Sequence, residues 1–270
     1  MAKLVIMLRV KDGIFFINEW LERYQDIADE IVALDNGSTD GTLDVLKSHP
    51  KVVQVLQTEG YNEGRDKNMV YDAVKERKAD WVMWLDADEI LEPGVNRKEF
   101  DRMMDSKVVD RYVFRRFHFI DREHFAGSPY WLNYSAGHDR MLWRDKPSGY
   151  FVDQLIDSPN VKGIGGVKYY TNYRLKHLGY INKALVDKKA DIYRGVFKED
   201  TPAMRTMYIH NEKKIRWVDN RRSLKVIGLN FILNLLLMKQ FAQKGLKLLV
   251  KPITKAFRKS KPAVMQQAVS

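Results

Sequence analysis

The segment WLDADE, residues 84–89, ends the last of four apolar runs in the first ninety residues. These runs are dense in Val, Ile and Leu and do not alternate with polar residues, which is typical of parallel strands covered on both faces. Helical patterns separate the runs, and this alternation predicts an α/β sheet with right-handed crossovers. We expect strands at residues 4–10, 30–36, 52–58 and 81–86, and helices at 14–24, 41–48 and 65–77.

Polar residues cluster where three of these strands end, at residues 9–12, 35–40 and 86–89. In open α/β sheets the ligand lies outside the carboxyl ends of the strands, so the three clusters predict one site. Asp86 and Asp88 have the i, i+2 spacing that points both side chains to one side of an extended chain. Paired carboxylates suit Mg²⁺ or Mn²⁺ that is also held by substrate phosphates. Alone, the pair also fits a solvated acidic turn.

A second polar segment, DNGSTDGT at residues 35–42, follows the second predicted strand and opens a helix. As structure alone it is a turn with capping residues. Together with the later carboxylates it resembles the nucleotide-sugar-binding half of family 2 glycosyltransferases, which have the GT-A fold. That family has D-x-G-S-x-D-G-T after the second strand and D-A-D at the end of the fourth. The segment NEGRDKN, residues 62–68, is a third match, and the resemblance is strong over residues 3–92.

The resemblance implies an inverting glycosyltransferase that uses a nucleotide-sugar donor, with a UDP-sugar favoured, and Mn²⁺ or Mg²⁺. Asp35 would accept a hydrogen bond from a uracil-type base, Arg65 would contact the base or a phosphate, and Lys67 would face the diphosphate. Asp86 would lie near the ribose and the metal, and Asp88 would ligate the metal. The implied donor-binding residues are Asp35, Asn36, Arg65, Lys67, Asp86, Ala87 and Asp88.

The reaction also needs a carboxylate that takes the proton from the acceptor hydroxyl. Relatives often carry an acidic residue after a strand of the form R-x-x-x-R, and Asp153 is our first choice on that ground. Asp139 and Asp157 are the alternatives, and each of the three also fits a surface ion pair. His177 begins the element HLGY, which is similar to a late H-x-G-Y element of the family. It is a candidate third metal ligand beside Asp86 and Asp88, or a structural histidine.

The pattern changes from about residue 97, which favours an acceptor-side half. We expect strands at residues 111–120 and 140–144 and a loop over 124–135. The aromatic-polar residues of that stretch fit either acceptor-sugar stacking or ordinary packing; they are Tyr130, Trp131, Tyr134 and His138. The expected domains are a GT-A domain over residues 1–218, with a nucleotide-sugar-binding half (1–96) and an acceptor-side half (97–218), and a helical tail over 219–270 that breaks at Pro252.

Composition excludes several classes of protein. The chain has no cysteine, so disulfide scaffolds, thiol nucleophiles, thiolate zinc sites and iron–sulfur clusters are excluded. A chain that is 45% hydrophobic and 270 residues long can bury a full core. The run of residues 4–8 is too short for a secretory signal, and the uncharged run at 226–238 is shorter than the roughly 20 residues that span a bilayer. We therefore expect a cytoplasmic protein.

The formal net charge of +11 comes from the end of the chain. Asp219 is the last acidic residue, and eleven of the 46 basic residues follow it, which leaves 35 basic against 35 acidic side chains before residue 221. The tail at 221–261 is basic and contains apolar residues, which fits an in-plane anchor on an anionic membrane surface at its inner face. The alternative is that residues 226–238 pack on the domain as a core helix.

The acceptor is a glycan or a lipid-linked saccharide in the interpretation we favour. Two alternatives remain open: the same fold acting on a nucleic-acid base or a protein, and a non-catalytic nucleotide-sugar-binding module. The neutral body argues against a duplex-binding face around the site. Asp35, Asp86 and Asp88 are all present, which argues against a non-catalytic module.

Overall fold

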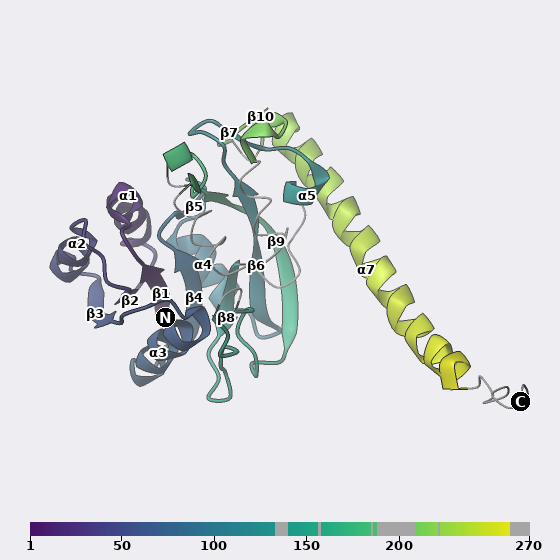
Figure 1. Cartoon of the computed structure of the whole chain (residues 1–270), viewed down its shortest axis with the longest axis horizontal. Coiled ribbons are helices and arrows are strands. Elements are labelled where there is room, and N and C mark those ends of the chain that lie inside the picture. Colours follow the sequence, from purple (N-terminus) through teal and green to yellow (C-terminus); the bar gives the residue numbers. More distant parts are fainter. Residues whose placement is uncertain (133–139, 156–157, 185, 188–208, 221, 260–270) are drawn as a thin grey trace, which may run out of the picture. The chain divides into compact units, whose positions relative to one another are not determined.

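The computed structural model of the chain describes residues 1–132, 140–155, 158–184, 186–187, 209–220 and 222–259 (Figure 1). Residues 1–221 and residues 222–270 form two compact units. The first unit contains an eight-stranded sheet with the order β3-β2-β1-β4-β8-β6-β9-β5. The second unit consists of helix α7 (Leu224–Lys259) and the residues around it.

The first four strands form the parallel part of the sheet. β1 pairs in parallel with β2 and with β4, and β2 pairs in parallel with β3. Helices α1 and α2 lie on one face of this part and α3 lies on the other (Figure 1). The bounds are β1 (Leu4–Val10), α1 (Ile14–Tyr24), β2 (Glu30–Asp35), α2 (Thr42–Ser48), β3 (Val52–Gln57), α3 (Glu63–Glu76) and β4 (Trp81–Asp86). The predicted βαβ alternation is therefore confirmed, with element ends shifted by one or two residues.

Burial of both faces explains why these strands are apolar without alternation. Val5 and Met7 of β1 pack with Val70 and Val74 of α3 in one core cluster. The intervening residue, Ile6, is also fully buried, and alternation along a strand points its side chain to the opposite face.

The second half of the sheet is mixed. β8 runs antiparallel to both β4 and β6, β9 runs parallel to β6, and β5 runs antiparallel to β9. The expected α/β class is thus confirmed, and the whole sheet is mixed. The bounds of this part are β5 (Glu89–Leu91), α4 (Arg97–Met104), β6 (Val109–His118), β8 (Arg140–Arg144) and β9 (Val167–His177).

Neither β5 nor α4 was expected from the sequence, and the structure differs from the sequence-based expectations in three further places. The stretch 124–135 contains β7 (His124–Ala126), which pairs with β10 (Lys214–Arg216), and α5 (Pro129–Leu132), where a loop was expected. β9 was not predicted, because its charged and polar residues hide the strand pattern. The expected break at Pro252 is wrong, since α7 continues through it. A proline inside a helix removes one backbone hydrogen bond and costs about 3 kcal/mol of helix stability. The backbone hydrogen bonds of the neighbouring turns are kept, so a helix can continue through it.

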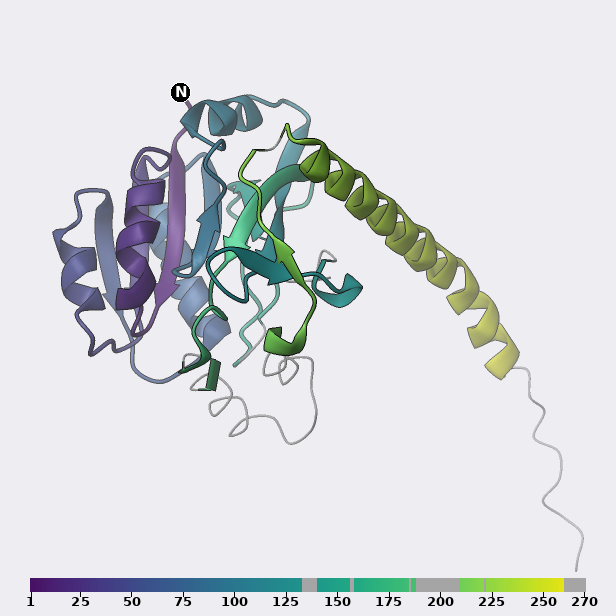
Figure 2. The ribbon, with the colours of Figure 1, turned by 90° about the horizontal axis from the view of Figure 1, so that it is seen from above.

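The carboxyl ends of β1, β2 and β4 lie at one edge of the sheet (Figure 2). The strand register pairs Val10 with Asp35 and Arg9 with Asp86. Asp35 and Asp86 therefore flank the end of β1, as the three polar clusters predicted.

Helix α7 is amphipathic over the turns whose side chains are described. Its exposed apolar side chains recur every three or four residues, which places them on one stripe of a helix; they include Leu224, Ile227, Phe231, Leu235 and Met238. Among the described residues no helix meets the length and hydropathy that a membrane span requires.

Candidate functional site

The segment at residues 35–42 folds into a tight turn around Asp35. The buried Asp35 accepts hydrogen bonds at Oδ1 from the backbone N–H groups of Gly37 (3.1 Å) and Ser38 (2.9 Å). Gly37 has φ +78°, a conformation that glycine adopts without strain. Asp35 Oδ2 is also buried, and it accepts no hydrogen bond within the described part of the chain. It is an acceptor that a ligand N–H group can satisfy.

The rest of this turn fixes the loop after β1. Asp12 accepts the N–H of Thr39 (2.9 Å), and Thr42 Oγ1 accepts the N–H of Gly13 (2.9 Å). Asp40 accepts the N–H groups of Ile14 and Thr42. Burial raises the pKa of Asp40, but the hydrogen bonds from Thr42 and Ile14 outweigh burial and lower it below the ordinary value. The ends of β1 and β2 are thus joined rigidly.

A layer of polar side chains follows β3 at the same edge. Asn36 Nδ2 donates to Thr58 Oγ1 (2.7 Å) and to the Gly60 carbonyl (2.8 Å). Arg65 is held by the fully buried Asp66, whose Oδ1 accepts from its Nε (2.9 Å) and Nη2 (2.7 Å). The guanidinium of Arg65 is partly exposed, so it can contact a ligand without losing this support.

Arg9, at the end of β1, completes this layer. Its guanidinium lies 4.6 Å from the centre of the Tyr61 ring and 3.4 Å from Asp66. Burial lowers the pKa of Arg9, but Tyr61 and the nearby carboxylates, Asp86 among them, outweigh burial and raise it. Arg9 therefore stays charged between the loop after β3 and Asp86.

Lys67 points inward from α3. Its Nζ contacts Glu63 (2.6 Å) and donates to the Ser158 carbonyl (2.8 Å), and burial lowers its pKa. The ammonium also lies 5.2 Å from the Trp84 ring. In this geometry Lys67 connects α3 to the segment after β8. Its positive charge also interacts with Asp86 at the end of β4.

Asp86 pairs with Arg140, the first residue of β8. The same guanidinium contacts the fully buried Glu89, whose second oxygen lies 3.2 Å from Arg116. Burial alone would lower the pKa of Arg140, but Asp86 and Glu89 outweigh burial and raise it. Arg140 therefore fixes the direction of the Asp86 carboxylate.

Asp88 faces a different group. Its Oδ2 lies 3.5 Å from Nε2 of His177, the last residue of β9. The backbone closes around it, since Leu178 donates its N–H to the Asp88 carbonyl and a Cβ added at Gly179 would meet Oδ2 at 2.2 Å. Any larger residue at position 179 would therefore displace the Asp88 carboxylate from this position. The buried Ala87 lies between the two carboxylates, beside Gly13.

This arrangement fits a divalent cation that shares its coordination with a diphosphate. Within the described residues no three His, Asp or Glu side chains gather into a group that could hold a metal ion. Asp88 and His177 form a pair, and Asp86 is turned toward Arg140. Mg²⁺ and Mn²⁺ commonly take one or two protein ligands and complete their shell with substrate phosphates and water. The protein thus offers part of a coordination shell.

Asp153 lies beside the start of α3. A Cβ at Gly64 would meet the Asp153 Cα at 2.7 Å, and the Gly64 N–H donates to the Gln154 carbonyl (2.9 Å). The Asp153 side chain is exposed at this position. Asp139 and Asp157, the two alternatives, lie outside the described residues, as do Tyr134 and His138.

Trp131 belongs to a buried cluster with Tyr180 and Ile209. Its indole nitrogen donates to Glu212 (3.2 Å), and its ring packs on His118. This is the packing role that the sequence left open, and a stacking surface for a sugar is not built from Trp131.

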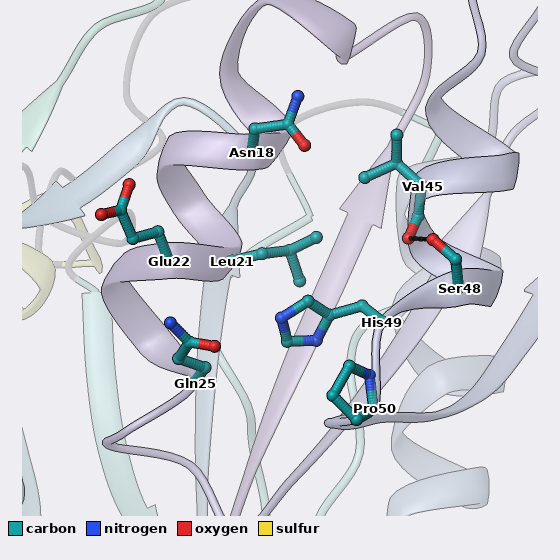
Figure 3. Close-up of a pocket in the computed structure, with 8 residues that line it drawn as sticks. All are labelled: Asn18, Leu21, Glu22, Gln25, Val45, Ser48, His49 and Pro50. Carbon is teal, nitrogen blue, oxygen red and sulfur yellow. Dashed lines mark hydrogen bonds between the residues drawn. The ribbon is translucent and has the colours of Figure 1, made fainter.

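A cavity of about 340 Å³ lies away from these residues. It opens between α1 and α2 and is lined in part by Gln25 and His49, which cap the ends of those helices (Figure 3). Helices that follow parallel strands end at the opposite edge of the sheet from the strand ends. The cavity is therefore not part of the candidate site.

Sequence reasoning missed several residues of this site. Arg9 stood in a polar cluster but received no role, and Asp66 lay unnoticed inside a recognised motif. Glu89 stood in the polar cluster at 86–89 and also received no role. Arg140 and His118 reach the site through strand pairing across the sheet, for which a single sequence gives little signal. The strand form R-x-x-x-R, which begins at Arg140, was the one hint.

Solved structures offer only remote likenesses. A TarS fragment of S. aureus matches at 15% identity, with 77% of this chain and 69% of that chain covered and a TM-score of 0.45. The mannosyltransferase PcManGT of Pyrobaculum calidifontis, solved with GDP-Man and Mn²⁺, matches at 13% identity over 77% and 70% with the same TM-score. Glucosyl-3-phosphoglycerate synthase of Mycobacterium tuberculosis matches at 14% identity over 44% of each chain, with a TM-score of 0.33. No curated protein matches the chain.

A family model covers the donor-side motifs and extends into the second half. Residues 16–154 match the model described as Glycosyl transferase family 2. This span includes the turn at 35–42, the carboxylates of β4 and the strand that carries Arg140, and it is more than half of the chain. The chain belongs to glycosyltransferase family 2.

Proposed function

We propose that this glycosyltransferase uses a nucleotide-sugar donor, in particular a UDP-sugar, together with Mn²⁺ or Mg²⁺. It transfers the sugar with inversion to a glycan or a lipid-linked acceptor. The observation that carries this proposal is the strand register, which sets a buried acceptor atom of Asp35 and the Asp86–Asp88 pair on either side of the end of β1.

The spacing of these groups suits a nucleoside diphosphate. β2 and β4 are both neighbours of β1, and two strand spacings amount to about 10 Å. Asp35 Oδ2 can accept the N–H of a pyrimidine base, while Arg65 and Arg9 border the base and ribose. The diphosphate then extends toward Asp88.

Asp88 and His177 would hold the cation, and Asp86 would orient the ribose from its contact with Arg140. A divalent cation there stabilises the negative charge of the departing diphosphate. Arg140 and Lys67 add fixed positive charge behind Asp86, which supports the same charge change without entering the coordination shell.

The proposed reaction is a single displacement at the anomeric carbon of the donor sugar. The acceptor hydroxyl oxygen forms a bond to the anomeric carbon as the bond from that carbon to the diphosphate oxygen breaks. A carboxylate takes the hydroxyl proton, and we assign this role to Asp153. Its exposure at the start of α3 leaves it open to an acceptor.

Ligand-linked stability tests the donor proposal. A ligand that binds only the folded protein raises the unfolding temperature, and the rise grows with the logarithm of the ratio of ligand concentration to dissociation constant. We expect UDP and one or more UDP-sugars to raise it with Mn²⁺ present and to lose most of that effect in chelator. If no nucleotide sugar raises the unfolding temperature, the proposal is contradicted. If only GDP compounds raise it, the donor carries guanine instead of uracil.

We also propose that α7 lies on an anionic membrane surface. The apolar stripe from Leu224 to Met238 is exposed, and the helix carries basic residues without a single acidic one. These are the features of an in-plane anchor, and each Lys or Arg near such a surface contributes about 1 kcal/mol. An enzyme placed there meets lipid-linked acceptors at the inner face of the membrane.

Vesicle co-sedimentation tests this second proposal on the full chain. Vesicles with anionic lipid should bind the protein at low salt and release much of it at high salt, because salt screens surface charge. Phe231→Glu should weaken binding at any salt, and Lys98→Glu, a charge change on α4, serves as the control. Equal binding to neutral vesicles, or none to anionic ones, would contradict the anchor. Truncation after Asn220 should leave a folded donor-binding unit, whereas the core-helix alternative predicts an unstable one.

A further inference from the structure

Two histidines that the sequence places 59 residues apart are direct neighbours in the sheet. β6 and β9 run in parallel, and their last registered pair is His118 with His177. The two Nδ1 atoms lie 3.1 Å apart, and both side chains are buried. On the other side of β9, His177 pairs with Glu89 of β5, so strand pairing fixes its backbone from both sides.

A hydrogen bond between two Nδ1 atoms constrains both rings. One Nδ1 must carry the hydrogen and the other must accept it, and a neutral imidazole carries one hydrogen in total. If His177 donates, its Nε2 carries a lone pair toward Asp88. If His118 donates, His177 has its hydrogen on Nε2 and cannot ligate a cation. The partner at Nδ1 therefore decides whether His177 can act as a ligand.

In the first arrangement, His177 and Asp88 lie close enough together to bind one cation. Adjacent ligands of an octahedral cation with bonds of about 2.1 Å lie about 3 Å apart. His177 Nε2 and Asp88 Oδ2 lie 3.5 Å apart, so a small closing movement brings both onto one ion. A lone pair facing a carboxylate is stable only when a cation lies between them.

The ring of His118 is itself held in place. It packs against Trp131 at 4.9 Å and Tyr180 at 5.7 Å between ring centres. Tyr180 also packs on His177 at 4.8 Å. This aromatic enclosure keeps Nδ1 of His118 directed at His177.

We propose that His118 is a positioning residue: it accepts the Nδ1–H of His177 and thereby presents the Nε2 lone pair of His177 to the cation beside Asp88. This inference rests on the proposed function, since it assigns a role toward the cation of that site. It predicts that affinity for the cation depends on an acceptor atom at position 118 and not merely on a ring there. Outer partners of metal-bound histidines typically contribute 10–100-fold in affinity.

Two variants separate the hydrogen bond from packing. His118→Phe keeps a ring but removes the acceptor, whereas Oδ1 of His118→Asn can replace Nδ1. The affinity for Mn²⁺ is measured with UDP present, by titration followed by electron paramagnetic resonance. We expect His118→Phe to bind Mn²⁺ about 10–100-fold more weakly than the unmodified chain. His118→Asn should stay close to the unmodified chain. His124→Phe is the matched control, because the ring of His124 bonds to Asp121 instead.

Nuclear magnetic resonance supplies a readout that packing alone would not change. In the full chain with UDP and Mg²⁺, long-range ¹H–¹⁵N spectra should show His177 with its hydrogen on Nδ1 and His118 with its hydrogen on Nε2. The His118 and His177 variants assign the signals. A His177 ring that carries its hydrogen on Nε2 in this complex would overturn the proposal.

The outcomes distinguish the two proposals. Equal Mn²⁺ affinity in His118→Phe and the unmodified chain, or equal loss in His118→Phe and His118→Asn, overturns the role of His118 and leaves the proposed function intact. If the unmodified chain fails to bind Mn²⁺ both when UDP is present and when GDP is present, the proposed function and this inference are overturned together.

Discussion

The two halves of the sheet bring side chains to the same site in different ways. In the donor half, residues 1–96, the turn at 35–42 and the carboxylates at the end of β4 follow their own strands, and the turn bonds mainly to nearby backbone. In the second half, Arg140, His118 and His177 arrive on strands that pair across the sheet. Local motifs therefore position the side chains of the donor half, and long-range strand pairing positions those of the second half.

This difference has an energetic side. The donor-side turn satisfies its carboxylates with backbone N–H groups, which are present in any sequence that adopts the turn. The second half satisfies buried carboxylates with arginines, as in the contact of Arg140 with Glu89 and Asp86. Removal of one partner from such a buried pair leaves an uncompensated charge, so the second half should be the more sensitive to single substitutions.

The largest effect is expected at Asp88. Asp88→Asn removes a ligand from the proposed cation and should lower turnover by about 10³-fold or more, since the cation supplies several kcal/mol of leaving-group stabilisation. The fold should persist, because Asn is nearly isosteric with Asp. Steady-state turnover with Mn²⁺ measures the effect, and Asp72→Asn, an exposed residue of α3, is the control. Near-normal turnover in chelator would remove the metal assignment.

Asp153 comes next and tests whether the second half also supplies the base. Asp153→Asn should lower turnover by about 10²–10⁴-fold and leave donor affinity unchanged, which is the range for loss of a general base. Turnover and donor titration are measured on the same variant. Asp139→Asn and Asp157→Asn are measured beside it. If one of them loses turnover while Asp153→Asn stays active, that residue and not Asp153 is the catalytic base.

Arg140 sharpens the energetic comparison. Arg140→Met should lower the free energy of unfolding by about 3–5 kcal/mol, because Glu89 and Asp86 lose a shared buried partner. Arg144→Met, at the other end of β8 and partly exposed, should cost much less. Urea unfolding of both variants measures the difference. Equal costs would show that β8 contributes by packing alone.

The smallest effect is expected at Glu30, where β2 begins at the far edge of the sheet. The hydrogen bond from Arg77, with a further contact from Lys3, lowers the pKa of Glu30 from 4.5 to about 2. A lowered pKa stabilises the fold above pH 4.5, and this contribution is lost as the pH falls toward 2. Exposed pairs contribute little, so Glu30→Gln should destabilise slightly at pH 7 and not at pH 2. Urea unfolding at both values tests this, and a pH-independent difference would contradict the pairing.

The sequence was most informative where a residue's role depends on its immediate neighbours. The turn at 35–42 could be predicted because Asp, Gly and Ser at those positions dictate a turn whatever the rest of the chain does. The βαβ alternation was equally local. Asp35 and Asp86 could be placed at one edge because parallel strands share their carboxyl ends.

Other parts depended on contacts that a single sequence does not reveal. β9 mixes charged and polar residues with aromatic ones, and its burial depends on its pairing with β5 and β6. The partnership of His118 with His177 exists only because those strands are in register. Pro252 is the opposite case, since this strong local signal for a helix end does not end α7.

The most direct test of the proposed site is a structure of the full chain with UDP and Mn²⁺, with the metal located by its anomalous scattering. We expect the uracil N–H within hydrogen-bond distance of Asp35 Oδ2, and Mn²⁺ ligated by Asp88 and His177 together with the diphosphate. A nucleotide bound between α1 and α2 in the cavity beside His49, or Mn²⁺ bound away from Asp88, would contradict it.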